Sequence, residues 1–215
     1  MRGSKQLTAT LTRLILVRHG TTPTTGKVLP GQAPGLHLSD YGLQQAMAVA
    51  DQLPTRFKNV ASLLTSPLER AQETAHPLSE RLNLTPIVEP RLIECDFGEW
   101  TGATLTKLYR KPAWRELMAQ AGNFRFPDGE AIRDVLARML ALVAELRVKH
   151  KGETVVGFTH ADPIKILATE ALGMHLDQMH RISVATASMT VFVVGETGIN
   201  LDSLNTGSLT KGPAA

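Results

Sequence analysis

The sequence predicts an α/β fold: a three-layer α/β/α domain built on a mainly parallel central sheet. Two observations carry this prediction. Short runs rich in leucine and β-branched residues alternate with amphipathic helical patterns along the chain, and residues 12–17 and 154–159 are nearly continuous runs typical of strands covered on both faces. Because such alternation favours parallel strands with right-handed crossovers, we expect the carboxyl ends of these two strands at one edge of the sheet.

The segment after the first strand is expected to be a loop, a helix and a second strand. Residues 21–38 hold three glycines and three prolines, which predicts a long loop of the kind that usually serves function. Ser39 is a candidate N-cap for a helix that ends before Pro54. Residues 60–65 are the next expected strand.

A helix start is expected at Ser66, with the serine as N-cap, Pro67 in the first turn and Glu69 three residues later. The helical pattern runs to about residue 83. Pro77 interrupts it, and we expect this proline to kink the helix or end it early.

The second half of the chain continues the alternation of strands and helices. We expect strands at residues 86–88, 154–159, 188–194 and 199–204, and helices at residues 105–110, 113–121, 130–150 and 163–172.

Composition places the chain among ordinary globular proteins. It has 215 residues, of which 43% are hydrophobic and 20% charged, with a net charge of +3. The few excess cations form no basic stripe, so we expect no nucleic-acid partner. There is no run of about 18 apolar residues, so we expect no membrane span. Cys95 is the lone cysteine; no internal disulfide can form, which fits a cytoplasmic location.

We expect one domain over residues 12–206, preceded by an N-terminal extension of residues 1–11. Residues 207–215 are small and polar and include Pro and Gly, which is typical of a flexible C-terminal tail. The sequence leaves open whether two copies form a homodimer.

Polar residues that suit phosphate chemistry stand where predicted strands end or helices begin. In chain order they are Arg18 and His19 after the first strand, Arg70 in the first turns of a helix, Glu94 in the irregular segment 91–102, and His160 at the end of strand 154–159. Because ligands bind beyond the carboxyl ends of strands in open α/β sheets, we expect these residues to share one site.

Each residue type in this set has a chemical reason to be there. A transferring phosphoryl group carries its charge on three oxygens, and the planar forks of Arg18 and Arg70 can each bind two of them. His19 is the expected nucleophile, through one ring nitrogen, while the other donates to an acceptor that fixes the tautomer. His160 and the backbone N–H groups near Ala161 would bind the same anion.

A leaving alkoxide needs a proton donor, and Glu94 is the candidate. It would protonate the leaving oxygen and then take a proton from the water that cleaves phosphohistidine. This role requires a raised pKa, which burial near Phe97 and Trp100 would supply. Asp96 and Glu99 are the rival acids in this segment. No metal or other cofactor is needed if arginines and histidines neutralise the phosphate.

Four motifs carry a family resemblance. They are Arg18-His19-Gly20-Thr21-Thr22, Ser66-Pro67-Leu68-x-Arg70-Ala71-x-x-Thr74-Ala75, Leu92-x-Glu94-x-x-x-Gly98-x-Trp100-x-Gly102 and Phe158-Thr159-His160. In this order they resemble the histidine phosphatase superfamily, the phosphoglycerate-mutase-like proteins, over nearly the whole domain. The Glu94–Gly102 and Ala171–Asp177 stretches are similar to a bacterial subgroup often labelled probable phosphomutase.

The resemblance implies a phosphoglycerate-mutase-like fold with His19 as the phosphorylated nucleophile and Glu94 as the proton donor. It implies that Arg18, Arg70 and His160 form the phosphate pocket. Gly31 matches a loop glycine near the substrate. Two positions depart from the family pattern, because Thr25 stands where the family usually has asparagine and Ala161 where it usually has glycine. We count Thr25, Gly31 and Ala161 as candidate substrate-binding residues.

The predicted function is hydrolysis of a small-molecule phosphate monoester through phosphohistidine. The enzymatic alternative is a phosphoglycerate mutase that depends on 2,3-bisphosphoglycerate. Mutases of this family carry a longer, arginine-rich connection before the second histidine, and this chain has a shorter one without an Arg-Arg pair, so the resemblance favours the phosphatase. A non-catalytic phosphate-binding or regulatory module is the alternative of another class. The loop over residues 22–38 and the segment over residues 105–129 are expected to set specificity.

Overall fold

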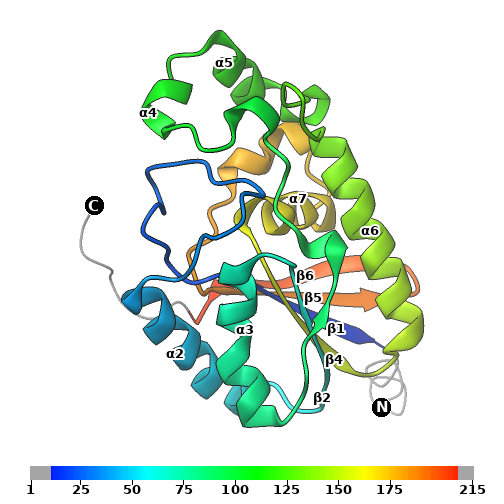
Figure 1. The fold of residues 1–215 in the computed structure, drawn as a ribbon. Helices are drawn as coiled ribbons and strands as arrows, with labels where there is room; N and C mark the ends of the chain where they lie inside the picture. The colour runs from blue at the N-terminus through cyan, green and yellow to red at the C-terminus, as the bar shows by residue number, and fades with distance from the viewer. Residues whose placement is uncertain (1–10, 208–215) are drawn as a thin grey trace.

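The computed structural model describes residues 11–207 and places a mixed sheet between two layers of helices (Figure 1). The described residues form six strands: β1 (Thr12–Arg18), β2 (Val60–Thr65), β3 (Ile87–Val88), β4 (Thr154–Thr159), β5 (Met189–Gly195) and β6 (Gly198–Thr206). They lie in the order β3-β2-β4-β1-β5-β6. The domain boundaries at residues 12 and 206 stay predictions, and most of the two expected terminal segments lies outside the described residues.

The sheet is mainly parallel, as the sequence predicts. Strands β3, β2, β4 and β1 run parallel, whereas β5 is antiparallel to β1, and β6 pairs antiparallel with β5 as a hairpin. In the β1–β4 register Val17 lies opposite Phe158, and Arg18 lies opposite Thr159. The histidine that follows each strand is thereby delivered to the same edge of the sheet.

Helices cover both faces of the sheet, which confirms the three-layer prediction. On one face, Ile15 and Val17 of β1 pack in a cluster with residues of α2 (Asp40–Arg56) and α3 (Glu69–Leu82). On the other face, Leu14 and Leu16 pack in a cluster with residues of α6 (Ile132–Lys149) and α7 (Ala161–Ala171). Successive β1 side chains therefore point to opposite faces, and both faces are buried.

Shorter elements lie beyond the carboxyl ends of the parallel strands. We call residues 105–126 the cap; the segment includes α4 (Leu105–Leu108), α5 (Pro112–Ala119) and the 3₁₀ turn η3 (Ala121–Asn123). Helices α4 and α5 lie at the top of the view in Figure 1. Three further 3₁₀ turns are η1 (Pro90–Leu92), η2 (Gly98–Trp100) and η4 (Leu176–Arg181). None of the helices within residues 11–207 combines the length and apolar character needed to cross a membrane.

Some expected helix boundaries are wrong. Helix α3 begins at Glu69 with Leu68 as its N-cap, so Ser66 does not cap it. The expected end near residue 83 is confirmed, since α3 continues through Pro77 to Leu82 with Asn83 as its C-cap. The reason is tertiary packing, because Ala75 and Leu78 on either side of the proline are buried in the cluster under α3, and such packing outweighs one lost hydrogen bond.

Two further boundaries differ from those expected. Pro54 lies inside α2, which runs on to Arg56. Helix α7 begins at Ala161 rather than at residue 163 and therefore follows His160 directly, with that histidine at the N-cap position. The turn η4 was not expected from the sequence.

Candidate active site

The two histidines lie side by side at the carboxyl ends of β1 and β4. The His19 backbone N–H donates to the Thr159 carbonyl over 2.9 Å and so extends the ladder between the strands by one residue. The two imidazole rings are 5.2 Å apart between centroids and are inclined at 57°. Both side chains are buried. Residues that are 141 positions apart are therefore neighbours, as the strand-end argument predicts.

The ring of His19 is held in one tautomer. Its Nδ1 lies 2.7 Å from the carbonyl oxygen of Gly20, an acceptor, so Nδ1–H donates and Nε2 keeps its lone pair. Burial, followed by the positive charges of Arg18 and Arg70, lowers the pKa of His19 to about 3. The ring is therefore neutral near pH 7, which is the state that a nitrogen nucleophile needs.

The turn after His19 requires glycine at position 20. A side chain there would bring its Cβ within 2.6 Å of the backbone carbonyl of Gly42 in α2. The close approach leaves the Gly20 N–H free to donate to the Thr74 hydroxyl of α3 at 3.0 Å. The same hydroxyl donates to the carbonyl of Arg70 at 2.6 Å. Thr74 thus ties the nucleophile turn to the helix that carries Arg70.

Arg70 and Arg18 bring two guanidinium groups to the site. Arg70 is fully buried, and its Nη2 donates to the Gly31 carbonyl at 2.7 Å. Arg18 donates from Nη1 to the Val184 carbonyl at 2.6 Å. Burial lowers the pKa of both groups. Each backbone carbonyl orients one arm of a guanidinium and leaves the others for a ligand.

His160 is held by Ser66. The His160 Nε2 lies 2.8 Å from the Ser66 hydroxyl, and both residues are fully buried. Burial and then the charge of Arg70 hold the pKa of His160 well below its usual value. This contact explains the serine that precedes α3: its hydroxyl orients a site histidine, and the sequence analysis missed that role.

Four buried nitrogen atoms around this point lack a hydrogen-bond partner among the described residues. They are Nε of Arg18, Nε and Nη1 of Arg70, and Nδ1 of His160. Buried polar groups without partners cost about 1–3 kcal/mol each, and more when they are charged. A tetrahedral oxyanion bound here would satisfy several of them at once.

Glu94 is the carboxyl group that accompanies these cations. It is buried, and its Oε1 accepts from the backbone N–H of Cys95 at 3.0 Å. Burial, followed by the negative charge of Asp162, raises the pKa of Glu94 to about 7. Its carbonyl accepts from Nε2 of Gln32 at 2.8 Å, which fixes the backbone that carries the acid. Near neutral pH such a group can both give and take a proton.

The rival acids occupy other positions. Asp96 accepts the Gly98 N–H at 2.9 Å and so closes a turn, and Glu99 belongs to η2. Neither lines the cavity at the site. Glu94 is the acid that the geometry favours.

A cavity of about 440 Å³ opens onto this cluster. Arg18, His19, Glu94, Thr25 and Ala161 are among the residues that line it. Arg70 and His160 are fully buried and do not belong to the lining. Five of the predicted site residues therefore line the cavity. The other two phosphate-binding candidates, Arg70 and His160, are buried in the protein behind this lining.

Gly31 and Thr25 have places that the sequence did not specify. Gly31 contributes its carbonyl to Arg70 and does not line the cavity. The Thr25 hydroxyl accepts from the Thr22 N–H at 2.9 Å, which commits it to the loop turn. A phosphate contact of Thr25, and substrate contacts of Gly31 and Ala161, stay predictions.

Sequence reasoning missed several residues at the cavity. Asp162 and Lys165 line it and pair with each other at 3.2 Å. Their signal was present, because they lie in the first turns of the helix that follows the second histidine. Gln32 had no such signal, since nothing in a loop sequence shows which side chain reaches the backbone of Glu94.

Comparison with known proteins agrees with this geometry. A family model for the histidine phosphatase superfamily (branch 1) matches residues 14–207. Bifunctional protein Rv2228c of Mycobacterium tuberculosis is 33% identical over 189 residues, which is 85% of this chain but 50% of that protein. This chain thus spans about half the length of that relative.

Two further relatives are matched over most of their length. Phosphoserine phosphatase 1 of Hydrogenobacter thermophilus is 30% identical over 191 residues, covering 86% of this chain and 88% of that protein. The solved structure of mycobacterial glucosyl-3-phosphoglycerate phosphatase Rv2419c superposes with a TM-score of 0.80 at 28% identity, covering 91% of this chain and 99% of that one. The chain belongs to the histidine phosphatase superfamily, branch 1.

Proposed function

We propose that this protein hydrolyses phosphate monoesters of small metabolites through a phosphohistidine formed at His19. The observation that carries the proposal is the state of the His19 ring, which is neutral and donates from Nδ1 to Gly20, so that the Nε2 lone pair is available. The partnerless nitrogen atoms of Arg18, Arg70 and His160 support phosphate binding beside it. The relatives named as phosphatases support the same reaction class.

The first half-reaction transfers the phosphoryl group to the enzyme. The Nε2 lone pair of His19 forms a bond to phosphorus while the bond from phosphorus to the ester oxygen breaks. Glu94, protonated, gives its proton to the departing alkoxide, and an alcohol leaves. The guanidinium groups of Arg18 and Arg70 stabilise the charge on the equatorial oxygens.

The second half-reaction restores the enzyme. Glu94, now a carboxylate, takes a proton from a water molecule whose oxygen attacks phosphorus. The bond from phosphorus to nitrogen breaks, the lone pair returns to His19, and inorganic phosphate leaves. Glu94 regains its proton in this step, so one residue serves as acid and then as base. A carboxyl group with a pKa of about 7 is suited to both roles.

Hydrolysis is favoured over mutase chemistry by the charges of the side chains that line the cavity. A mutase must hold a second phosphate, which requires additional cations. Of the described residues that line the cavity, only Arg18 and Lys165 carry a positive charge, and Lys165 is paired with Asp162.

The test is turnover of 4-nitrophenyl phosphate by the wild-type protein and by His19→Ala, with His76→Ala on the exposed side of α3 as the control. We expect turnover by the wild type and by the control, and its abolition in His19→Ala. Retained activity in His19→Ala would remove the nucleophile from the proposal. Rapid conversion of 3-phosphoglycerate to 2-phosphoglycerate in the presence of the bisphosphate would make the protein a mutase.

A further inference from the structure

The cavity extends from His19 to the cap, and its outer wall is apolar. Six large apolar side chains of the cap line it: Leu105, Tyr109, Trp114, Leu117, Met118 and Phe126. A volume of about 440 Å³ lies within the usual range for small-molecule sites, roughly 300–1,000 Å³. A phosphoryl group at His19 would fill only a part of this space, so the remainder is available to the leaving group.

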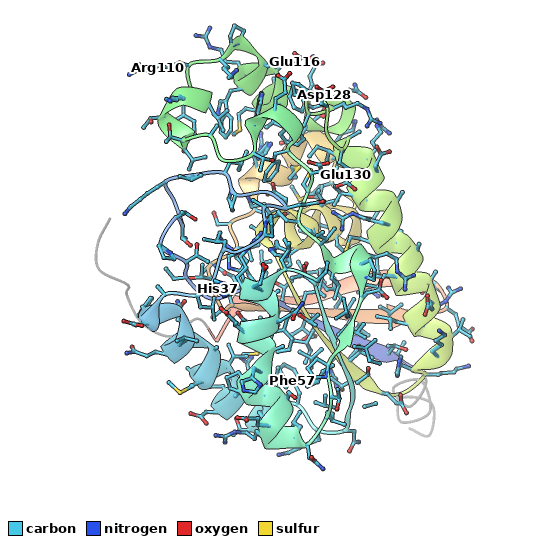
Figure 2. All side chains as sticks on the ribbon, in the orientation of Figure 1. His37, Phe57, Arg110, Glu116, Asp128 and Glu130 are labelled. Carbon is cyan, nitrogen blue, oxygen red and sulfur yellow. The ribbon has the colours of Figure 1, made fainter. Side chains whose placement is uncertain are left out.

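Two side chains of this wall are unusually exposed for their type. Tyr109 retains 52% and Met118 44% of their accessible surface. The Tyr109 ring packs edge-on against Trp114 with the centroids 4.9 Å apart, so the two rings form one aromatic surface. Figure 2 shows Arg110 and Glu116 at the outer edge of the cap. The cap thus carries charges on its outside and apolar side chains at the cavity.

The polar side of the cavity offers no free cation to a second anionic group. Within the described part of the chain, Arg18 and Lys165 are the arginine and lysine residues of the lining. Arg18 lies beside the nucleophile, where the phosphoryl group binds. Lys165 is neutralised by Asp162, which lies 3.2 Å from it in the same turn of α7. A carboxylate on the leaving group would have to break that pair.

We infer that the preferred substrate is the phosphate monoester of a bulky, uncharged alcohol with an apolar or aromatic face that packs against Tyr109, Trp114 and Met118. This inference deepens the proposed function and rests on it. An apolar face gains from being buried against the exposed wall. A small or carboxylate-bearing alcohol leaves the wall uncovered, and the carboxylate has no cation to meet.

The test compares kcat/KM for primary alkyl phosphates, of which the ethyl and phenylalkyl esters have leaving alcohols of similar basicity. The series is ethyl phosphate, 2-phenylethyl phosphate, 3-phenylpropyl phosphate and O-phosphoserine, with phosphate release as the readout. We expect the phenylalkyl esters to exceed ethyl phosphate by about tenfold or more, the scale of discrimination typical of apolar pockets. We expect phosphoserine to be poorer than 2-phenylethyl phosphate.

Variants assign the preference to the cap. Met118→Ala and Tyr109→Ala should lower kcat/KM for 3-phenylpropyl phosphate at least fivefold more than they lower it for ethyl phosphate. Tyr109→Phe, which keeps the ring, should retain the preference. Met47→Ala is the matched control, since Met47 is 52% exposed on α2 and does not line the cavity. Equal kcat/KM for ethyl and phenylalkyl esters, or a preference for phosphoserine, would overturn the inference.

A binding measurement separates this inference from the proposed function. Calorimetry with 3-phenylpropylphosphonate and ethylphosphonate requires no turnover. Tighter binding of the phenylpropyl compound, weakened by Met118→Ala, would support the apolar subsite even if no ester were hydrolysed. Equal affinity for the two phosphonates would reject the subsite even if 4-nitrophenyl phosphate were turned over.

Discussion

At the scale of single residues, the site shifts the pKa values of His19 and Glu94 in opposite directions. Burial and two neighbouring guanidinium groups lower the pKa of His19 to about 3. Burial and the carboxylate of Asp162 raise the pKa of Glu94 to about 7. Over the pH range between these values His19 is neutral and Glu94 is protonated. This is the pairing of states that attack on phosphorus with proton donation requires.

Removal of the acid should affect esters according to their leaving groups. For Glu94→Gln we expect kcat for an alkyl phosphate to fall by about 100-fold or more, which is the usual scale of general acid catalysis. The loss in phosphoryl transfer to His19 from 4-nitrophenyl phosphate should be smaller, since nitrophenolate leaves without a proton. Single-turnover release of alcohol from each ester measures the two effects. Equal losses for both esters would mean that Glu94 does not protonate the leaving oxygen.

The pH dependence of the wild-type protein follows from the same group. In the proposed mechanism the protonated form of Glu94 is the donor, so kcat/KM for an alkyl phosphate should decline as the pH rises through about 7. Asp162→Asn removes a charge that raises this pKa, so its decline should begin at a lower pH. Profiles recorded on both proteins with the same ester check the direction. A decline that begins at a higher pH in Asp162→Asn than in the wild type would contradict the assignment of this pH dependence to Glu94.

At the scale of elements, the loop over residues 21–38 holds the site together from outside. Two adjacent loop residues form hydrogen bonds to site residues. The Gly31 carbonyl accepts from Arg70, and the Gln32 amide donates to the Glu94 carbonyl. The loop is fastened to α3 by Glu73, which accepts from the Leu38 N–H at 2.8 Å. The His37 ring, labelled in Figure 2, pairs with the same carboxylate.

Loss of the Gln32 amide should loosen the acid without removing any group that contacts substrate. For Gln32→Leu we expect kcat for an alkyl phosphate to fall about tenfold, the equivalent of one hydrogen bond. The pH at which kcat declines on the alkaline side should also differ from that of the wild type. Gln44→Leu, at an exposed position of α2, is the matched control. Steady-state kinetics from pH 5 to pH 9 measure both effects. A change of less than about twofold, with the same pH profile, would show that Gln32 does not position Glu94.

The parts of this structure that could be predicted from sequence are those fixed by strand ends. The pattern of β1 and β4 sufficed to place His19 and His160 at one sheet edge, because parallel strands end together. The residues at which helices begin and end were harder to predict from the sequence. Ser66 has the chemistry of an N-cap, and its hydroxyl accepts from the Leu68 N–H at 3.3 Å, but only tertiary structure shows that the same hydroxyl pairs with His160.

The walls of the cavity could not be predicted from sequence. The cap helices are short, and their side chains face the site residues across the cavity. A local sequence pattern does not show which side chains face one another there. Proximity between distant segments is thus specified by packing of the whole chain.

At the scale of the whole molecule, the fold buries ionisable groups that the unfolded chain would expose. His19 and His160 are buried with lowered pKa values, and Glu94 is buried with a raised one. Below pH 6.5 both histidines bind a proton in the unfolded chain but stay neutral in the native state. The free energy of unfolding therefore falls as the pH is lowered. Glu94 opposes this trend between its ordinary pKa and about 7, because its native state holds the extra proton.

Replacement of one histidine should therefore flatten the acid dependence of stability. Between pH 6.5 and 5, the free energy of unfolding of His19→Gln should decline less steeply than that of the wild type, by up to about 1.4 kcal/mol per pH unit. The His76→Gln variant, changed at an exposed histidine, provides the control. Urea unfolding at several pH values measures the slopes. Parallel slopes for His19→Gln and the wild type would show that His19 is not held neutral by the fold.

The most direct test of the central claim is to trap the phosphorylated enzyme. Mixing the protein with a phosphate ester and quenching in alkali within one turnover should yield a phosphoryl group on the peptide that contains His19, stable in base and labile in acid. Mass spectrometry of that peptide locates the group. We expect phosphorylation at His19 and none in His19→Ala. Turnover with no phosphoenzyme, or with the group on another residue, would contradict it.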